Sequence, residues 1–436
     1  MALEHPICEL LLQFHTFDTP CTKSLNFDAI IGGELNFEAR ELLFVATQQR
    51  DTLIDGISNE GDRVDPRNVI AAIELYMPSI YKITHSMEQS ATAQIKLNRP
   101  LEFSWTSALA KKKTEFKIGV LVYEVCFILT TKALALYNNA KQMLSHENPN
   151  RSSNLAAAAN ELKKGAGILD FVAQILLPRW VNPPENTPPE VQIDVLICLS
   201  NLFQCTAQRI TVVQGILKDT PPSALAKLLM GISERYRITD ESMQHLSNVK
   251  DMIKEEAKVW PAISMGLSSR FLGMKAAIDL KIGDAIGYLA RAIDEMEAIK
   301  PSQKILGLKD AIGVCSYVLH EQFKEYKVEN ESIYFMGVPT RDRLQVAQGI
   351  FMNQIVGYSL PEVDAVSFAS ASLEDDFSSV TIDEPATGGI ASWFGRSSKT
   401  KLDEVSCPPG YDKSVFDQLP PDVQAEVIMQ YKSTQN

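Results

Sequence analysis

The stretch that decides the fold is LSSRFLGMKAAIDLKIGDAIGYLARAIDEMEAIK, residues 267–300. In its second half the apolar residues recur every three to four positions, which is the period of an α-helix with one buried face. Six residues share this face: Ala285, Ile286, Leu289, Ala292, Ile293 and Met296. In the first half, the small residues Ala276 and Ala277 allow a partner helix to come close. The stretch therefore predicts two helices packed side by side.

The same helical spacing dominates from about residue 35 to 356. Proline-rich loops interrupt it at RWVNPPENTPPE (179–190) and KDTPPS (218–223). Strand signals are confined to short pieces such as SLNFDAIIG (24–32) and SIYFMGV (332–338). We predict a mostly α fold whose helix pair resembles the units of tetratricopeptide arrays, without a regular repeat along the chain.

The composition is that of a globular protein with a large core, since 45% of the 436 residues are hydrophobic and 22% are charged. The formal net charge is -12, from 42 basic and 54 acidic residues, and this field opposes binding to nucleic acid or anionic lipid. We expect no nucleic-acid partner. The seven cysteines are scattered and form no CxxC pair, a pattern typical of reduced thiols in a cytosolic protein.

The most apolar window is IGVLVYEVCFILTTKALAL, residues 118–136. It is nearly long enough to span a bilayer, but it contains Glu124 and Lys132. Each charge would cost about 2.5 kcal/mol or more near a membrane centre. We therefore predict a buried core helix here.

Motifs of catalysis and metal binding are missing from the sequence. None of the six histidines lies within metal-ligand spacing of another, and there is no HExxH motif. There is also no glycine-rich phosphate loop and no GxSxG nucleophile turn. We expect a protein that is not an enzyme, with no catalytic residues, no metal and no cofactor.

The composition changes after about residue 360, where serine, alanine and acidic residues replace the helical pattern. The few large apolar residues are too sparse to order a backbone. We expect a helical domain over residues 1–360, a flexible acidic linker over 361–405 and a separate tail over 406–436.

Within the expected linker, Trp393 and Phe394 stand beside Arg396, Lys399 and Lys401. An aromatic pair next to cations suits the interface of a membrane or the groove of a partner protein. A linker segment without a role of its own has the same appearance. These three interpretations stay open at this point.

The tail contains VFDQLPPDVQAEVIMQ, residues 415–430. Pro420 interrupts any helix, whereas Pro421 suits the first position of a new one, so the pattern predicts helix, turn, helix. Val423 and Val427 lie on one face of the second helix, and Val415 and Phe416 supply the first. Such a segment is marginally stable until it meets a partner or docks on its own domain.

Several segments resemble the BRO domain family, the Alix and Brox group that works with the endosomal sorting (ESCRT) machinery. They lie in family order over residues 95–350, and their most characteristic positions are Phe103, Trp105, Tyr123, Glu124, Gly167, Asn330, Ile333, Tyr334 and Pro339. The resemblance implies a curved helical domain around a tetratricopeptide-like core, with a small N-terminal β-sheet. The first 90 residues match less well. The proline-rich tail of Alix-type members and the prenylation box of Brox-type members are not found.

In that family a patch on the concave face takes up the C-terminal helix of the ESCRT-III filament subunit. The resemblance transfers this patch to four residues: Thr211, Ala224, Leu225 and Leu228. Leucines one helical turn apart can hold a helix in a groove, but the same spacing is found in residues that face the core. Because Thr211 and Ala224 are smaller or more polar than the residues of some members, we expect modest affinity.

The tail resembles the ubiquitin-binding motif of translesion DNA polymerases. Nine positions match its signature: Asp412, Val415, Phe416, Leu419, Pro420, Asp422, Val423, Gln424 and Glu426. The resemblance implies that ubiquitin contacts Val415, Phe416, Leu419, Pro420, Val423 and Val427, with the Leu-Pro pair at the centre.

The two resemblances together imply a non-enzymatic adaptor of the endosomal sorting machinery. It would be cytoplasmic, reach endosomes through an ESCRT-III subunit and bind ubiquitin or ubiquitinated cargo through its tail. The alternative is a peptide-binding signalling scaffold of the pH-response type, which does not depend on ESCRT-III.

Overall fold

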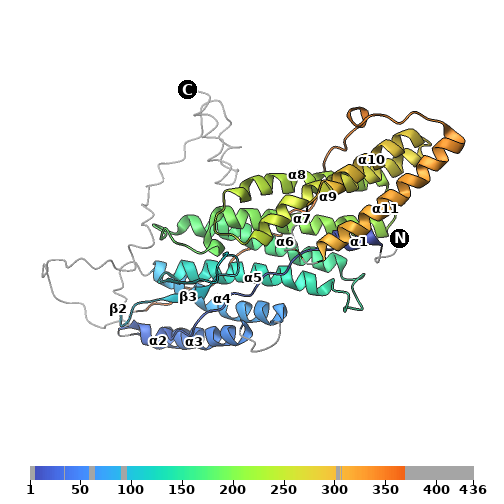
Figure 1. Ribbon diagram of the computed structural model, residues 1–436. Coiled ribbons are helices and arrows are strands. Elements are labelled where there is room, and N and C mark those ends of the chain that lie inside the picture. Colours follow the sequence, from blue (N-terminus) through green and yellow to red (C-terminus); the bar gives the residue numbers. More distant parts are fainter. Residues whose placement is uncertain are drawn as a thin grey trace, which may run out of the picture. The chain divides into compact units, whose positions relative to one another are not determined.

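The structure is a computed structural model that describes residues 5–33, 35–57, 64–89, 96–300, 305 and 307–368. Helices dominate this part of the chain (Figure 1). They are α1 (Pro6–Leu11), α2 (Phe27–Ile30), α3 (Phe37–Ile57), α4 (Pro66–Gln89), α5 (Leu121–Met143), α6 (Leu155–Phe171), α7 (Ile193–Leu217), α8 (Pro222–Gln244), α9 (Asp251–Ile278), α10 (Ile282–Glu297) and α11 (Leu308–Glu329). The predicted mostly α class is confirmed.

The β-structure of the described residues consists of two short antiparallel pairs. Strand β1 (Ile31–Gly32) pairs with β2 (Lys96–Leu97), and β3 (Phe103–Thr106) pairs with β4 (Glu115–Ile118). The expected small N-terminal sheet is therefore present.

The strand signal at residues 332–338 was wrong. Residues Asn330–Tyr334 continue α11 as a π-helical turn, and Phe335 then adopts a left-handed conformation with φ of 52°. The Asn330 side chain closes this turn, since its Nδ2 donates to Met336 O and its Oδ1 accepts from Met336 N, both at 2.9 Å. Because these backbone groups are bonded locally, they have no need of a partner strand.

The helix pair at residues 267–300 is confirmed as the second half of α9 and the whole of α10, which pack side by side (Figure 1). All six residues of the expected face of α10 are buried. The two helices come close at Gly273, where an added Cβ would meet Ala285 O at 3.2 Å. Ala276 is buried against the pair, whereas Ala277 is only half-buried.

Helix α5 contains the apolar window and is long and apolar enough to cross a membrane by composition, but 89% of that window is buried inside the protein. Its Glu124 is fully buried and accepts hydrogen bonds from Arg50 Nε at 3.0 Å and from Trp105 Nε1 at 2.6 Å. Lys132 pairs with Glu74 of α4 at 2.9 Å. The predicted core helix is confirmed, because both charges that argued against a membrane span have protein partners.

After α11 the chain returns in an extended conformation along the earlier helices. Its last described residues are anchored, since Val366 N donates to Ser86 Oγ at 2.9 Å and both Val366 and Phe368 are buried. The described residues thus pack against the domain up to residue 368, and the boundary expected at residue 360 stays a prediction. The remainder of the expected linker, with Trp393 and Phe394, and the tail over 406–436 lie outside the described residues.

Candidate functional site: the α7–α8 face and its strap

The four residues expected to bind a helix lie on α7 and α8, but in two different environments. Leu225 is only 3% exposed and belongs to the core between these helices. Thr211, Ala224 and Leu228 are half-buried, and Leu228 packs against the edge of the core. The structure thus gives Leu225 a core position and leaves the other three at the surface.

An extended segment of the same chain lies beside these residues. We call residues 345–360 the strap. Ile350 N of the strap donates to Lys227 O of α8 at 3.0 Å, and Val356 N donates to Lys163 O of α6 at 3.1 Å. Asn353 Nδ2 donates to Thr211 Oγ1 at 3.0 Å. The strap therefore crosses α6, α7 and α8 and directly contacts one of the expected site residues.

Gln208 of α7 is the central polar anchor of the strap. Its Nε2 donates to Ile350 O at 2.8 Å and to Leu228 O at 3.0 Å. Its Oε1 accepts from Met352 N at 2.8 Å. One amide side chain thus bonds to three backbone groups and fixes the strap against the Leu228 turn of α8.

Two glycines give the strap room to lie this close. A Cβ at Gly167 would stand 1.8 Å from Val356 O, and one at Gly231 would stand 2.3 Å from Ile350 O. No side chain is compatible with the first distance. Gly167, one of the positions that carry the family resemblance, therefore marks a backbone contact between α6 and the strap.

The strap alternates between an inner and an outer face, as extended chains do. Inward residues include Phe351, which Arg235 of α8 covers at 5.0 Å, and Asn353. The outer face carries four exposed apolar side chains: Val346, Ile350, Met352 and Val356. Met352 is 64% exposed. With Leu228 and the strap joined through Gln208, this side of the domain offers an apolar strip in which the backbone groups of Ile350 and Met352 and the N–H of Val356 are already bonded.

On its other side α7 is fixed by a buried charge cluster. Arg209 Nη2 donates to Glu256 Oε1 of α9 at 3.1 Å, and His15 bonds the second carboxylate oxygen. Burial opposes ionisation of Glu256, but the attraction and hydrogen bond of His15, together with Arg209, outweigh it and hold the pKa of this carboxyl below its usual value. This cluster ties α7 to α9 and keeps the strap-bearing face of α7 in position.

The chemistry of this face is that of binding. The amides of Gln208 and Asn353 and the hydroxyl of Thr211 are engaged in hydrogen bonds. The exposed side chains of the strap include its four apolar residues together with Gln348 and Gln354. Among the described residues no group of three His, Cys, Asp or Glu side chains is arranged to hold a metal ion. A surface of this kind suits the apolar face of a partner helix.

Sequence reasoning missed the strap and Gln208. The signal for Gln208 was weak, because Gln204, Thr206 and Arg209 near it are polar too, and the signal for the strap was the apolar-rich stretch VAQGIFMNQIV at residues 346–356. Neither indicates its partner, because Gln208 and Met352 meet only in the folded chain. The expected ubiquitin contacts Val415, Phe416, Leu419, Pro420, Val423 and Val427 lie outside the described residues.

Comparison with protein families gives two matches along the chain. The profile of the BRO1-like domain matches residues 69–381. The profile of a ubiquitin binding region matches residues 405–435, which contain the tail motif. Comparison with curated proteins gives no match.

Solved structures with a similar fold are BRO1 domains. The chain resembles the ALIX BRO1 domain of a complex with CHMP4C, with a TM-score of 0.66 and 15% identity over 82% of this chain and 99% of that one. It also resembles ALIX in complex with the SIVmac239 PYKEVTEDL late domain, with a TM-score of 0.65 and 14% identity over 81% of this chain and 50% of that one. A Bro1 domain studied for endosomal targeting gives a TM-score of 0.60 and 15% identity, over 79% of this chain and 93% of that one.

The helical fold and the extent of the profile match agree with each other. The matched residues run from α4 to beyond the strap and so include the entire α7–α8 face. The chain therefore belongs to the BRO1-like domain family.

Proposed function

We propose that this protein is a non-enzymatic adaptor that binds the C-terminal helix of an ESCRT-III filament subunit with its BRO1-like domain and ubiquitin with its tail. The observation that carries the first half is the apolar strip formed by Leu228 and the outer face of the strap. A partner helix laid on it would bury apolar surface, and the backbone groups of Ile350 and Met352 already have their hydrogen-bond partners. The ALIX BRO1 domain with a similar fold was solved in a complex with CHMP4C, which supports the choice of partner.

In this proposal the partner helix contacts Leu228, Ile350 and Met352, with Thr211 and Ala224 at the edge of the contact. Leu225 acts from below, because it supports the turn of α8 that carries Leu228. The polar Thr211 adds little apolar area, so we expect weak binding of the isolated helix. Assembly of many subunits would then strengthen recruitment to endosomes through avidity.

The test is a titration of the full-length protein with a fluorescent peptide that contains the C-terminal helix of CHMP4C. We expect saturable binding, weakened about 10-fold or more by Leu228→Asp and by Met352→Asp, because each change places a charge in an apolar contact. Phe44→Asp is the matched control, since Phe44 is also an exposed apolar residue but lies on α3. Absence of binding by the wild type, or equal binding by all four proteins, contradicts this half of the proposal.

The second half of the proposal rests on the profile match over residues 405–435. Isotope-labelled ubiquitin is titrated with the full-length protein and with its Leu419→Ala variant, and the shifts of ubiquitin signals are followed by NMR. We expect weak, saturable shifts that Leu419→Ala removes. Binding that persists in the variant would place the contact outside the Leu-Pro pair. A signalling scaffold that recognises another peptide would leave the titration with the CHMP4C peptide without effect.

A further inference from the structure

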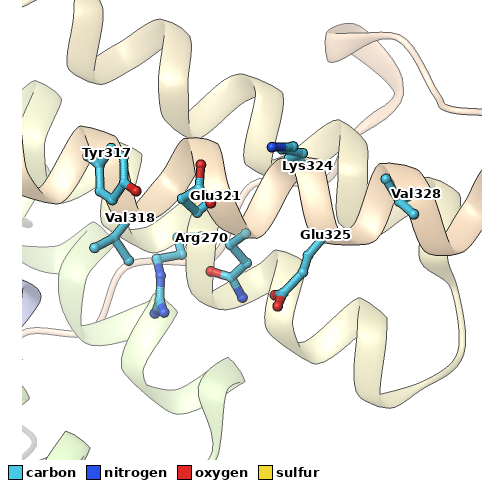
Figure 2. A pocket seen from close by; sticks show the side chains of 8 residues that line it. Arg270, Tyr317, Val318, Glu321, Lys324, Glu325 and Val328 are labelled. Carbon is cyan, nitrogen blue, oxygen red and sulfur yellow. The ribbon is translucent and has the colours of Figure 1, made fainter.

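A groove separate from the strap lies between α9 and α11. We call it the α9–α11 groove. Arg270 of α9 lines it together with residues of α11 that include Tyr317, Glu321, Gln322, Glu325 and Val328, and its volume is about 540 Å³. Figure 2 shows the guanidinium of Arg270 and the carboxylate of Glu325 on the same side of α11. Nothing in the proposed binding of ESCRT-III or ubiquitin uses this groove.

Arg270 is a buried charge without a counter-ion in the described part of the chain. Arg270 is only 4% exposed. Its Nη1 donates to the weak acceptor Met274 Sδ at 3.1 Å, and its Nε has no acceptor. Burial lowers the pKa of this guanidinium, and the groups that partly offset burial are the thiols and phenol of Cys315, Tyr326 and Cys8. Buried charges in folded proteins are normally paired. Arg270 departs from this rule, because it has no anionic or carbonyl partner among the described residues.

Other polar groups of the groove are also unpaired. The Oε1 atom of Gln322 is buried and has no donor, while its Nε2 donates to Tyr326 Oη at 3.1 Å. Within the described residues, the exposed carboxylates of Glu321 and Glu325 form no ion pair or hydrogen bond. Exposed Tyr317 and Val328 lie at the two ends of the lining. The groove therefore has a buried donor, a buried acceptor, two acidic side chains at its surface and apolar ends.

This pattern excludes several simple ligands. A metal cation would meet the buried guanidinium, and an inorganic dianion would meet Glu321 and Glu325, which balance the charges of Arg270 and Lys324. The ligand must present one negative group to Arg270, a hydrogen-bond donor to Gln322 and a positive group to the two carboxylates. The end of a peptide chain has all three: a terminal carboxylate, a backbone N–H and, where the sequence supplies one, a basic side chain.

We propose that the α9–α11 groove binds the C-terminal end of a partner protein that carries a basic residue near its terminus. The terminal carboxylate lies on Arg270, the basic side chain on Glu321 and Glu325, and apolar residues next to it contact Tyr317 and Val328. The buried arginine supplies specificity for the terminus, because a neutral amide end cannot compensate its charge.

The test uses the fluorescein-labelled peptide GSVKVL with a free carboxylate and the same peptide with an amidated end. Both are titrated into the full-length protein at low ionic strength. We expect the free acid to bind and the amide to bind about 10-fold more weakly, which is the loss expected for a hydrogen bond between charged groups. Inorganic phosphate is added as a competitor, and we expect it to leave the peptide bound.

Variants of the protein test whether the peptide binds in the groove or at another positively charged surface. Arg270→Met should remove the preference for the free acid, whereas Arg237→Met, which changes an exposed arginine of α8, should preserve it. Glu325→Gln should weaken the lysine peptide but not a variant peptide with glutamine in place of lysine. Absence of binding at millimolar peptide, equal binding of acid and amide, displacement by phosphate, or full preference in a folded Arg270→Met protein overturns the proposal.

Discussion

Two buried arginines, on α7 and α9, both have an Nε without an acceptor, but they differ in their counter-ions and in the partners of their Nη atoms. Arg209 of α7 is 0% exposed and Arg270 of α9 is 4% exposed. Arg209 donates to Glu256 at 3.1 Å and to Gln13 O at 2.8 Å, and it lies over the Trp260 ring at 3.8 Å. Arg270 has only Met274 Sδ as a hydrogen-bond acceptor among the described residues. The first arginine is part of the fold, whereas the second faces a groove and is completed by a ligand.

The glutamines beside these arginines repeat the contrast. Both the donor and the acceptor of the Gln208 amide are bonded under the strap, whereas Gln322 has a buried oxygen without a donor. Buried polar groups are nearly always satisfied in folded proteins. An unsatisfied group next to a cavity therefore marks a place where a partner fits, and a satisfied group marks internal structure.

Removal of the paired arginine should have the largest effect. Arg209→Met leaves the Glu256 carboxylate buried without its cation, which costs about 3–5 kcal/mol of the free energy of unfolding. Urea unfolding followed by circular dichroism at neutral pH measures this loss. A loss below about 1 kcal/mol would mean that His15 alone compensates the carboxylate.

The strap anchor should come next. Gln208→Leu leaves Ile350 O and Met352 N without their partner, and we expect a loss of about 2–3 kcal/mol because water can reach part of the released strap. Limited proteolysis should cut the variant within residues 345–360 earlier than the wild type. An uncut strap at unchanged stability would mean that its apolar inner face suffices to hold it.

The backbone contact of the strap should give a somewhat smaller change. Gly167→Ala places a Cβ against Val356 O and should cost about 1–3 kcal/mol through overpacking. Gly313→Ala is the matched control, since Gly313 lies in α11 with nothing within 4 Å of an added Cβ. The control should gain up to about 1 kcal/mol from helix propensity. Equal effects of the two changes would contradict the close contact between α6 and the strap.

Replacement of the unpaired arginine should give the smallest loss of stability, or a gain. Arg270→Met removes a buried charge that has no counter-ion, so the free energy of unfolding should stay within about 1 kcal/mol of the wild type or increase. The same urea experiment compares it directly with Arg209→Met. A loss as large as that of Arg209→Met would show that Arg270 is structurally paired and would remove the reason for a ligand.

Much of the fold was predictable because its signals are local. The apolar period at residues 282–297 predicted α10 and its buried face, and the charges of Glu124 and Lys132 predicted that α5 is a core helix. The strand signal at 332–338 failed because the Asn330 side chain bonds to the backbone of the turn and the chain continues α11 for another turn. The apolar and β-branched residues of this segment fit the pattern of a strand, but no strand among the described residues pairs with it.

The candidate site was only partly predictable. Family resemblance led to α7 and α8, but one leucine spacing could not separate core from surface, and Leu225 lies in the core while Leu228 lies at its edge. Leu225 and Leu228 are one helical turn apart. The way in which α7, α8 and the strap cross decides which of the two is accessible. That crossing is set by packing between segments far apart in the chain.

The sequence by itself determined the helical class, the α9–α10 pair and the tail motif, since each depends on residues close together in the chain. Only the tertiary structure decided that a strap from beyond α11 covers Gln208 and that Arg270 is buried without a partner. Hydrogen bonds and counter-ions are properties of neighbours in space. A sequence shows that a polar group exists, whereas the fold decides whether the group is satisfied or left to bind something else.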